Sequence, residues 1–576
     1  MKRNIWLLLI TLALLSVACR PSVSPLPTRA YLVQVESSAT PPIPLTDTSA
    51  TVTATLIRLP ATLTPLATPT LIKTTPTTTA ISPTATPIAL PSASPPTAAT
   101  DVRQPVIVPA SPTSDTPIPT DSPPPIPTDT SPPVSTNTPL PPVNGVLPYT
   151  IEPASPPTSN VGVWTTESTI TILTYQFQQA FIPTAPDDSA YPYPRLDFGQ
   201  VGPPVPQTYR AIHLENGYVG LTILPELGGR LYRWLDKGTG RQLLYQNPVI
   251  KPSAWGYRGW WLAAGGIEWA FPVEEHGLNE WRPWNVSVGG TSITVSDIDD
   301  RTGMEVGATI SLRAGSSAFT IQPYAKNDTE QAHEYQLWLN AMLTLGGNTV
   351  SPETEFIVPA SQVTIHSSGD GGVPGAGGGM SWPVHGGRAM NFYGNWQGHI
   401  GFFFPPNGFA ALYDHAAQQG IVRSHAPGWP AGAKFFGPAG YAPSYWTDDN
   451  SNYVELWSGA TSTFWANGIL QPGQSVGWSE QWYPVSHLDG LTYANSAAAL
   501  RLTENDAGVD VGLAVSSSGQ FTVELYAGNQ PIATWQISLS PGQAFRSRWT
   551  RDRAGELGLK VVDNAGTPIA QTGAIP

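Results

Sequence analysis

The chain has 576 residues, a formal net charge of −13 and only 12% charged residues. An acidic chain so poor in Lys and Arg lacks the basic footprint of nucleic-acid-binding proteins, so this class of partner is excluded. The combination of low charge with 20 Trp and 20 Tyr suits a protein that meets neutral, ring-shaped polar ligands, although large β-sandwiches also bury many aromatic residues.

The first residues have the pattern of a targeting signal. Lys2 and Arg3 precede an apolar run over residues 5–15, which is too short to span a membrane comfortably. The run ends in LSVAC, which resembles the cleavage box of bacterial lipoproteins, and Cys19 is the only cysteine of the chain. We therefore expect residues 1–19 to be a lipoprotein signal peptide and Cys19 to be lipidated, which anchors the protein to the membrane at the cell surface. An ordinary cysteine in a signal peptide or uncleaved anchor is the alternative.

Residues 20–145 consist mainly of Pro, Thr, Ser and Ala, as in TPLATPTLIKTTPTTTAISPTATP. Such a segment has no apolar period and cannot bury enough surface to offset the entropy of chain ordering. Because proline favours an extended backbone of about 3.1 Å per residue, the maximum reach is about 300–400 Å. The composition therefore predicts a disordered, semi-stiff stalk.

Alternating apolar residues appear after the stalk. Val219, Leu221 and Ile223 alternate with other residues, and the same period of two recurs over residues 306–312 and 509–515. Turn signals such as DNAG and LSPGQ separate these runs, and no sustained helical period follows the signal peptide. We therefore expect an all-β fold, with a large two-sheet β-sandwich over residues 146–490 and a small accessory β-sandwich over residues 491–576.

Residues 255–277 (WGYRGWWLAAGGIEWAFPVEEHG) hold four Trp, three Glu, one Arg and one His. Arg258 and Glu268 need partners within so apolar a stretch. Tryptophan faces beside Arg and Glu suit sugar recognition, because CH groups stack on the rings and hydroxyls take charge-assisted hydrogen bonds. A buried Arg–Glu pair that closes a sheet end is the alternative. The candidates are Glu268 and His276 for catalysis and, for binding, Arg258, Trp260, Trp261 and Trp269.

Further candidates come from later segments. Trp338 and Asn340 share one face of the predicted strand LWLNAM, and three loop residues join them as binding candidates: Trp382, Lys434 and Trp446. Glu455 lies between Val454 and Leu456 in a predicted strand, so its side chain points away from theirs, into a ligand groove or into solvent. No His pair has metal-ligand spacing, so neither a metal site nor a cofactor is expected.

These segments together resemble the galactose mutarotase-like superfamily, and specifically an uncharacterised bacterial family of unknown function that often carries tetratricopeptide (TPR) repeats. The matching stretches include HLENGYVGLTILPELGGRLYRW, YRGWWLAAGGIEWAFPVEEH, LWLNAML, NYVELWSG and SEQWYPVSHLDG. They run in order from about residue 160 to residue 490, and no TPR pattern follows them in this sequence.

The resemblance implies a curved two-sheet sandwich with a sugar-binding concave face. GGIEWAFP is similar to the GGIP…FP segment of hexose-phosphate epimerases, and Glu455 stands where aldose epimerases keep their catalytic glutamate, the general base. The strand comparable to the one with the epimerase histidine has Asn340 near that place. Because Asn cannot transfer a proton at neutral pH, this departure argues against ordinary mutarotase chemistry.

Three functions remain open at this point. The first expectation is a monomeric, surface-anchored module that binds a neutral oligo- or polysaccharide. The alternative is a carbohydrate-active enzyme, either a glycoside hydrolase, a lyase or an epimerase, in which Glu268 and Glu455 act as the carboxylate pair and His276 is a third candidate. A structural envelope protein that has lost ligand binding is the third possibility.

Overall fold

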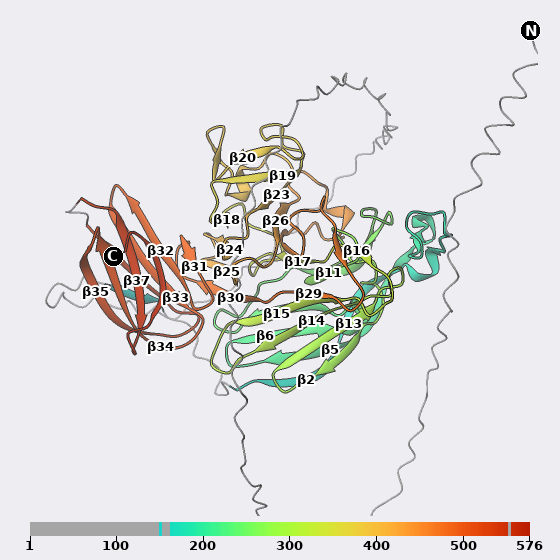
Figure 1. The fold of residues 1–576 in the computed structure, drawn as a ribbon, viewed down its shortest axis with the longest axis horizontal. Coiled ribbons are helices and arrows are strands. Elements are labelled where there is room, and N and C mark those ends of the chain that lie inside the picture. The colour runs from blue at the N-terminus through green and yellow to red at the C-terminus, as the bar shows by residue number, and fades with distance from the viewer. Residues whose placement is uncertain (1–148, 153–161, 551–553, 576) are drawn as a thin grey trace, which may run out of the picture. The chain divides into compact units, whose positions relative to one another are not determined.

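The computed structural model describes residues 149–152, 162–550 and 554–575 (Figure 1). The predicted signal peptide with Cys19 and the predicted stalk lie outside these described residues. Within them no helix is long and apolar enough to cross a membrane. The helical elements described are single 3₁₀ turns: η1 (Gln178–Ala180), η2 (Phe198–Gln200), η3 (Pro225–Leu227), η4 (Tyr393–Asn395) and η5 (Pro443–Tyr445).

The largest sheet contains 14 strands, most of them antiparallel to their neighbours. In spatial order they are β10 (Trp261–Gly265), β9 (Gln246–Ser253), β2 (Trp164–Gln176), β5 (Gly202–Glu215), β6 (Val219–Leu224), β7 (Arg230–Asp236), β11 (Ile267–Ala270), β17 (Trp338–Leu343), β27 (Val454–Gly459), β26 (Gly432–Gly437), β23 (Ile400–Phe404), β19 (Gln362–Ser368) and β20 (Gly379–Ser381), with β8 (Arg241–Gln242) paired to β7.

A second sheet of nine strands forms the other layer. It comprises β12 (Asn285–Val288), β13 (Ser292–Ile298), β14 (Glu305–Leu312), β15 (Phe319–Lys326), β30 (Glu480–Ser486), β25 (Gln419–His425), β24 (Phe409–Asp414) and β18 (Thr354–Ile357), with β29 (Ser475–Gly477) paired to β15. Three two-stranded ribbons complete the domain: β3 (Phe181–Ile182) with β4 (Arg195–Leu196), β16 (His333–Tyr335) with β28 (Gly468–Leu470), and β21 (Val384–His385) with β22 (Arg388–Ala389).

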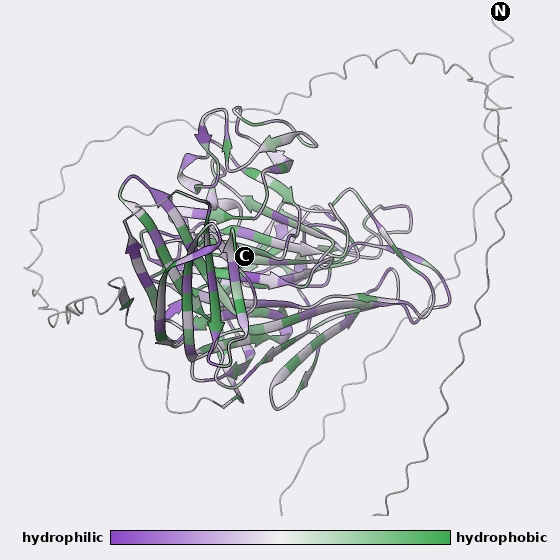
Figure 2. Ribbon diagram, turned by 60° about the vertical axis from the view of Figure 1, so that its left-hand side comes forward, coloured by the Kyte–Doolittle hydropathy of each residue, from purple (hydrophilic) through white to green (hydrophobic). Residues whose placement is uncertain are grey.

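The two sheets pack face to face through one continuous apolar core. Trp234 of β7 shows how the layers meet, because its ring contacts Phe319 of β15 (4.9 Å between ring centroids) and Trp482 of β30 (6.3 Å), both edge-on. Alternating hydrophobic and hydrophilic residues appear as green and purple bands along many strands (Figure 2). The prediction of an all-β fold with a large two-sheet sandwich is confirmed.

The alternation of side chains along β27 also determines which residues point to the outer face of the 14-stranded sheet, the face turned away from the second sheet. Val454 and Leu456 of β27 belong to the core between the sheets. Glu455, between them, therefore points to the opposite face, as the sequence predicted. That outer face carries the site described below.

A C-terminal β-sandwich has a core of its own. Its sheets are β1 (Tyr149–Glu152), β36 (Ala544–Trp549), β33 (Gly508–Val515), β32 (Ala498–Asn505) and β31 (Tyr493–Ala494), and β35 (Gln530–Leu539), β34 (Gly519–Ala527), β37 (Leu557–Asp563) and β38 (Pro568–Gly573). One strand comes from an unexpected place, because β1 precedes the large domain in the chain yet pairs with β36, with Ile151 opposite Phe545. The sequence analysis had placed this strand in the large domain.

Candidate functional site

Four neighbouring strands of the 14-stranded sheet align one residue each in a single row. Glu268 of β11 lies opposite Asn340 of β17, which lies opposite Trp457 of β27, which lies opposite Lys434 of β26. Residues directly opposite each other on adjacent strands point to the same face of a sheet. Glu455 lies two residues before Trp457 and therefore points to this face as well. The pairing register thus gathers chemically active side chains from segments far apart in the sequence.

A cavity of about 320 Å³ opens on this face. Its volume lies at the lower end of the range of about 300–1,000 Å³ that is typical of small-molecule sites. Eight Trp, Tyr and Phe residues and six His, Glu and Lys residues line the cavity, and the principal ones are Trp261, His276, Lys434, Tyr441, Glu455 and Trp457. The site therefore suits a small, flat ligand with polar edges.

Behind the cavity wall, Glu268 is fully engaged by three buried partners. His276 donates from Nδ1 to Glu268 Oε1 (2.7 Å), Asn340 donates from Nδ2 to the same oxygen (3.1 Å), and Arg230 donates from Nη2 to Oε2 (3.0 Å). Burial opposes ionisation of Glu268, but the charges of His276 and Arg230 and these hydrogen bonds outweigh it, so its pKa lies below the ordinary value. Glu268 is therefore a buried carboxylate.

His276 connects this buried carboxylate to the cavity. Its ring stacks on Trp261, with the centroids 4.2 Å apart and the planes at 8°. Burial alone would lower its pKa, but the charge and hydrogen bond of Glu268 and the charge of Glu455 outweigh burial, so the pKa of His276 is raised. Because Nδ1 is used by Glu268, Nε2 is the nitrogen that remains for a ligand. The preceding residue, Glu275, has a left-handed φ of 72°, a strained conformation that turns the chain so that His276 faces the sheet.

Glu455 and Lys434 form another part of the wall. Trp457 donates from Nε1 to Glu455 Oε2 (2.8 Å). Burial raises the pKa of Glu455, and the charges of Lys434 and His276 limit that rise. The Lys434 ammonium lies 4.6 Å from the ring centroid of Trp457 and 4.5 Å from that of Phe464. Burial lowers the pKa of Lys434. Among the described residues, its Nζ has no hydrogen-bond or ion-pair partner, so its donors are available to a ligand in the cavity.

The structure brings together about half of the residues selected from the sequence. Five of them line the cavity: Trp261, His276, Lys434, Trp446 and Glu455. Glu268 and Asn340 lie directly behind His276 and hold it in place. The buried Asn340 therefore contacts the site through Glu268.

Arg258 is not the partner of Glu268, and its predicted place in the ligand groove is wrong. It is fully buried, pairs with Glu280 (Nη2 to Oε1, 2.8 Å) and covers the ring of Trp260 at 3.6 Å. Trp260 belongs to a second apolar cluster, between β2, β5, β9 and β10, rather than to the described cavity wall. Arg258 thus forms a buried Arg–Glu pair, as the alternative expected, but its partner is Glu280.

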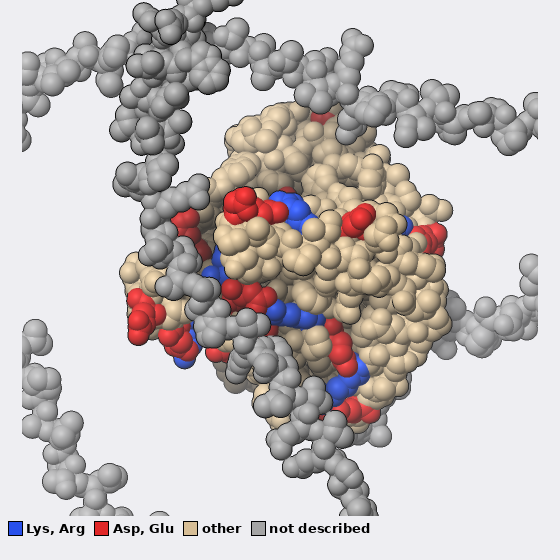
Figure 3. Space-filling model, turned by 90° about the vertical axis from the view of Figure 1, so that its right-hand side faces the viewer, with Lys and Arg blue, Asp and Glu red and all other residues tan. Residues whose placement is uncertain are grey.

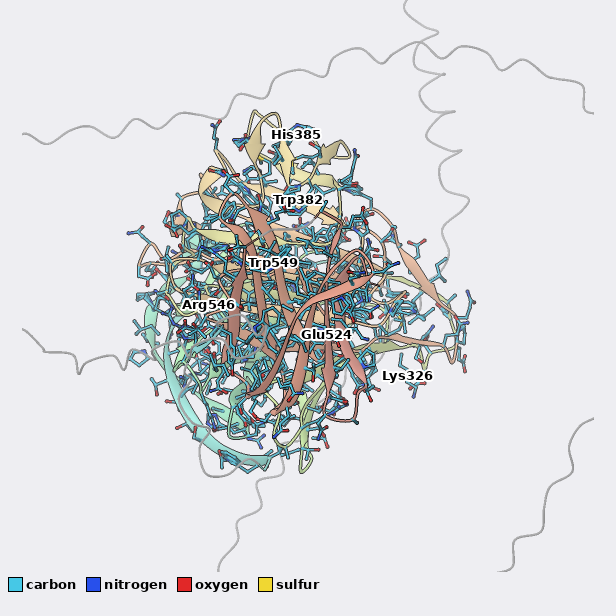
Figure 4. The ribbon with its side chains drawn as sticks, turned by 90° about the vertical axis from the view of Figure 1, so that its left-hand side faces the viewer. Lys326, Trp382, His385, Glu524, Arg546 and Trp549 are labelled. Atoms are coloured by element: carbon cyan, nitrogen blue, oxygen red, sulfur yellow. The ribbon has the colours of Figure 1, made fainter. Side chains whose placement is uncertain are left out.

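Three further tryptophans are buried outside the described cavity wall, contrary to the prediction that they line a groove. Trp269 lies in the core between the two sheets. Trp338 packs edge-on against Phe464 (4.7 Å), and Trp382 packs against Phe402 (4.8 Å). Figure 4 shows Trp382 among the yellow strands around β20 and β21. All three rings are buried, and none belongs to the described wall of the cavity. Trp338 shares the face of Asn340, as the sequence predicted, but lies in an apolar cluster with Trp457 and Phe464.

Several residues of the site were not selected from the sequence. Trp457 could have been selected, because it follows Glu455 by two residues in the same strand and its side chain must therefore point to the same face. Arg230 lies in GGRLYRW, a segment that reads as an ordinary hairpin. Tyr441 and Tyr445 come from the loop between β26 and β27, and no sequence period predicts which loop side chains face a cavity.

Comparison with known families gives two matches. Residues 186–485 match the family described as a domain of unknown function, DUF5107, and residues 493–571 match the second domain of YphG-like proteins. The first match covers most of the large sandwich, including all the site residues named above, and the second covers most of the C-terminal sandwich.

Solved structures with a similar fold include a TPR-domain-containing protein from Parabacteroides distasonis, with 24% identity and a TM-score of 0.50 over 57% of this chain and 56% of that one. A galactose mutarotase-like protein from Lactobacillus casei shares 13% identity (TM-score 0.34; 48% and 99% covered), and a galactose mutarotase related enzyme from Lactobacillus acidophilus shares 11% (TM-score 0.36; 48% and 97%). At these identities the likeness concerns the fold. The predicted resemblance to the family of unknown function is confirmed.

Proposed function

The chain belongs to the DUF5107 family, and we propose that its large domain binds a neutral carbohydrate in the cavity on the 14-stranded sheet. One observation carries this proposal: a cavity walled by stacked aromatic rings holds the His276 imidazole, the Glu455 carboxyl group and the Lys434 ammonium on one face. Sugars offer apolar CH faces that stack on aromatic rings, and hydroxyl edges that both donate and accept hydrogen bonds. The cavity combines both kinds of partner.

The charges of the site favour a neutral ligand. The carboxyl group of Glu455 faces the same cavity as the cations of Lys434 and His276, and the charge of His276 is already balanced by Glu268. No single sign of charge dominates the wall, so a strongly charged ligand gains little. On the face drawn in Figure 3, charged residues of both signs lie close together within a mainly uncharged surface.

We also propose that the domain is displayed at the cell surface. The supporting observations are the signal-like residues 1–19 with Cys19 and the Pro/Thr/Ser-rich residues 20–145. A lipid anchor followed by an extended spacer would carry a sugar-binding domain away from the membrane. Fractionation of cells that express Cys19→Ala tests this part, because the variant should leave the membrane fraction.

A second candidate function, carbohydrate catalysis, is favoured by the arrangement of His276 and Glu455. Asn340 cannot transfer a proton, but it hydrogen-bonds Glu268, which in turn orients His276 toward the cavity. A histidine with a raised pKa and a buried carboxyl group on one cavity wall are a suitable acid and base for epimerase or hydrolase chemistry. Glu268, with both oxygens engaged, would position His276 rather than act on substrate. From the strand register, the Cα atoms of Glu268 and Glu455 are about 12 Å apart.

A structural protein without a ligand is the least supported function, because that role predicts a filled outer face rather than a cavity with unpaired polar groups. A glycan-array screen of the full chain tests binding, with Trp457→Ala expected to weaken binding by about 1–3 kcal/mol. Trp429→Ala is the matched control, because this ring is exposed and lies outside the described cavity wall. NMR of each bound sugar then shows whether its anomers interconvert or its linkages break. If the array finds no bound glycan, the proposal is wrong.

A further inference from the structure

Two aromatic residues stand at the mouth of the cavity with much of their surface exposed. Trp255 and Tyr445 both line the cavity, yet they remain 53% and 57% exposed. The rings deeper in the wall, Trp261 and Trp457, are almost completely buried. Apolar surface left in water costs about 25 cal/mol per Å² relative to burial. Exposed rings beside a cavity are therefore typical of surfaces that contact a ligand.

These two rings flank a third, and together they form an aromatic rim, which we define as Trp255, Tyr441 and Tyr445. The ring of Tyr441 lies 6.3 Å from that of Trp255 and 6.4 Å from that of Tyr445, edge-on in both cases. Tyr441 is itself stacked on His399 at 4.4 Å, which fixes the centre of the rim. The rim thus extends the aromatic wall outward from the cavity.

The backbone beneath the rim is held although its outer rings are exposed. Lys251 donates from Nζ to the carbonyl oxygen of Ser444 (2.8 Å) and to Asp448 Oδ1 (2.7 Å), on either side of Tyr445. Asn247 donates from Nδ2 to the carbonyl oxygen of Trp446 (2.6 Å). A ring on a fixed backbone loses little conformational entropy when a ligand stacks on it, so the rim is preorganised for contact.

We propose that the rim is a second sugar-binding position, so that the ligand is an oligosaccharide with one residue inside the cavity and the next stacked on Trp255 and Tyr445. This inference rests on the proposed function. The cavity volume, about 320 Å³, is at the low end for small-molecule sites, so a longer ligand must extend past the mouth. The exposed rings at that mouth offer the uncharged flat surface that a sugar's CH face requires.

The test compares ligands of increasing length on the full chain by isothermal titration calorimetry. The probes are the gluco-, galacto-, manno- and xylo-configured series from the monosaccharide to the tetrasaccharide. In a series that binds, the disaccharide should bind at least about tenfold more tightly than the monosaccharide. The double variant Trp255→Ala/Tyr445→Ala should lose this gain, so that it binds the disaccharide no more tightly than the monosaccharide. Trp429→Ala, 43% exposed and outside the described wall, should keep the gain.

The outcomes separate this inference from the proposed function. A monosaccharide that binds as tightly as its longer homologues, or a double variant that retains the gain with length, overturns the second position and leaves the cavity as a sugar site. If the wild type binds no member of any series, the proposed function fails and this inference fails with it. An unchanged melting temperature of the double variant shows that its loss is not due to unfolding.

Discussion

The large domain contains two buried Arg–Glu pairs with different surroundings. In one, Arg258 pairs with Glu280 inside an apolar cluster, and its remaining donors reach the carbonyl oxygens of Trp260 and Leu278. In the other, Arg230 pairs with Glu268, whose second oxygen accepts from His276 at the cavity. Both pairs join a guanidinium to a carboxylate. They differ in the group that the pair contacts next, which is a backbone carbonyl for Arg258 and the His276 side chain for Glu268.

A buried ion pair is therefore not by itself a sign of function. The Arg258–Glu280 pair, whose other hydrogen bonds go to backbone carbonyl groups, stabilises the packing at the end of the sheet. A pair whose carboxylate also holds a titratable side chain facing a cavity transmits its charge to a ligand site. We therefore expect substitutions in the Arg258 pair to change stability alone, and substitutions in the Arg230 pair to change both stability and the site.

The largest effect is expected for Glu280→Ala, which leaves Arg258 buried without its counter-charge. Removing one partner of a buried ion pair costs about 3–5 kcal/mol. Urea denaturation should show this loss, while the folded protein keeps its sugar affinity. The double variant Arg258→Met/Glu280→Leu should recover most of the loss, because an apolar replacement of both partners is often close to neutral. A single variant as stable as the wild type would contradict this reading of the pair.

Glu268→Gln should have a smaller effect on stability and a specific effect on the site. The loss is expected to be about 1–3 kcal/mol, because Arg230 still donates to the carbonyl oxygen of Gly265 (2.7 Å) and Gln offers one acceptor. The pKa of His276 should fall, because burial, which lowers it, is then no longer outweighed by the Glu268 carboxylate. NMR titration of the His276 ring measures this change, and an unchanged pKa would separate His276 from Glu268.

Glu268→Gln should also change how the stability of the protein depends on pH. The pKa of His276 is higher in the folded protein than its ordinary value. Its stabilising contribution is therefore complete below the ordinary pKa of histidine and is lost as the pH rises through the raised, folded-state pKa. Wild-type stability should decline across this window, and Glu268→Gln should lack that decline. Thermal unfolding at a series of pH values makes the comparison.

The sequence predicted the fold class and pointed to one residue of each ion pair, Arg258 and Glu268, but it could not assign their partners. Alternation predicted that Glu455 faces away from Val454 and Leu456, because that strand is regular. The alternation of faces does not hold across residues 261–269. Trp261 and Trp269 are an even number of residues apart, yet Trp261 faces the cavity and Trp269 faces the core. Gly265 and Gly266 lie between these two tryptophans and have positive φ values of 79° and 75°, and the pairing register of β10 with β9 shifts at this point. A bulge of this kind reverses the faces, and a period of two cannot reveal it.

The smallest effect on stability is expected for Lys434→Met, because losing the costly burial of an ammonium group offsets the lost cation–π contacts. Its effect on the site is electrostatic. Burial raises the pKa of Glu455 and the charge of Lys434 limits that rise, so the pKa of Glu455 should be higher in the variant. If the ionised carboxylate accepts sugar hydroxyls, affinity is present above this pKa and is lost as the pH falls through it.

The loss of affinity on acidification should therefore occur at a higher pH in Lys434→Met than in the wild type. Calorimetric titration with the tightest-binding sugar across a pH series measures the shift. Glu455→Gln is the control, because it removes the titrating group and with it this step. Identical pH profiles for the wild type and Lys434→Met would show that Lys434 does not act on Glu455, and the cavity would then recognise its ligand through the aromatic wall and His276.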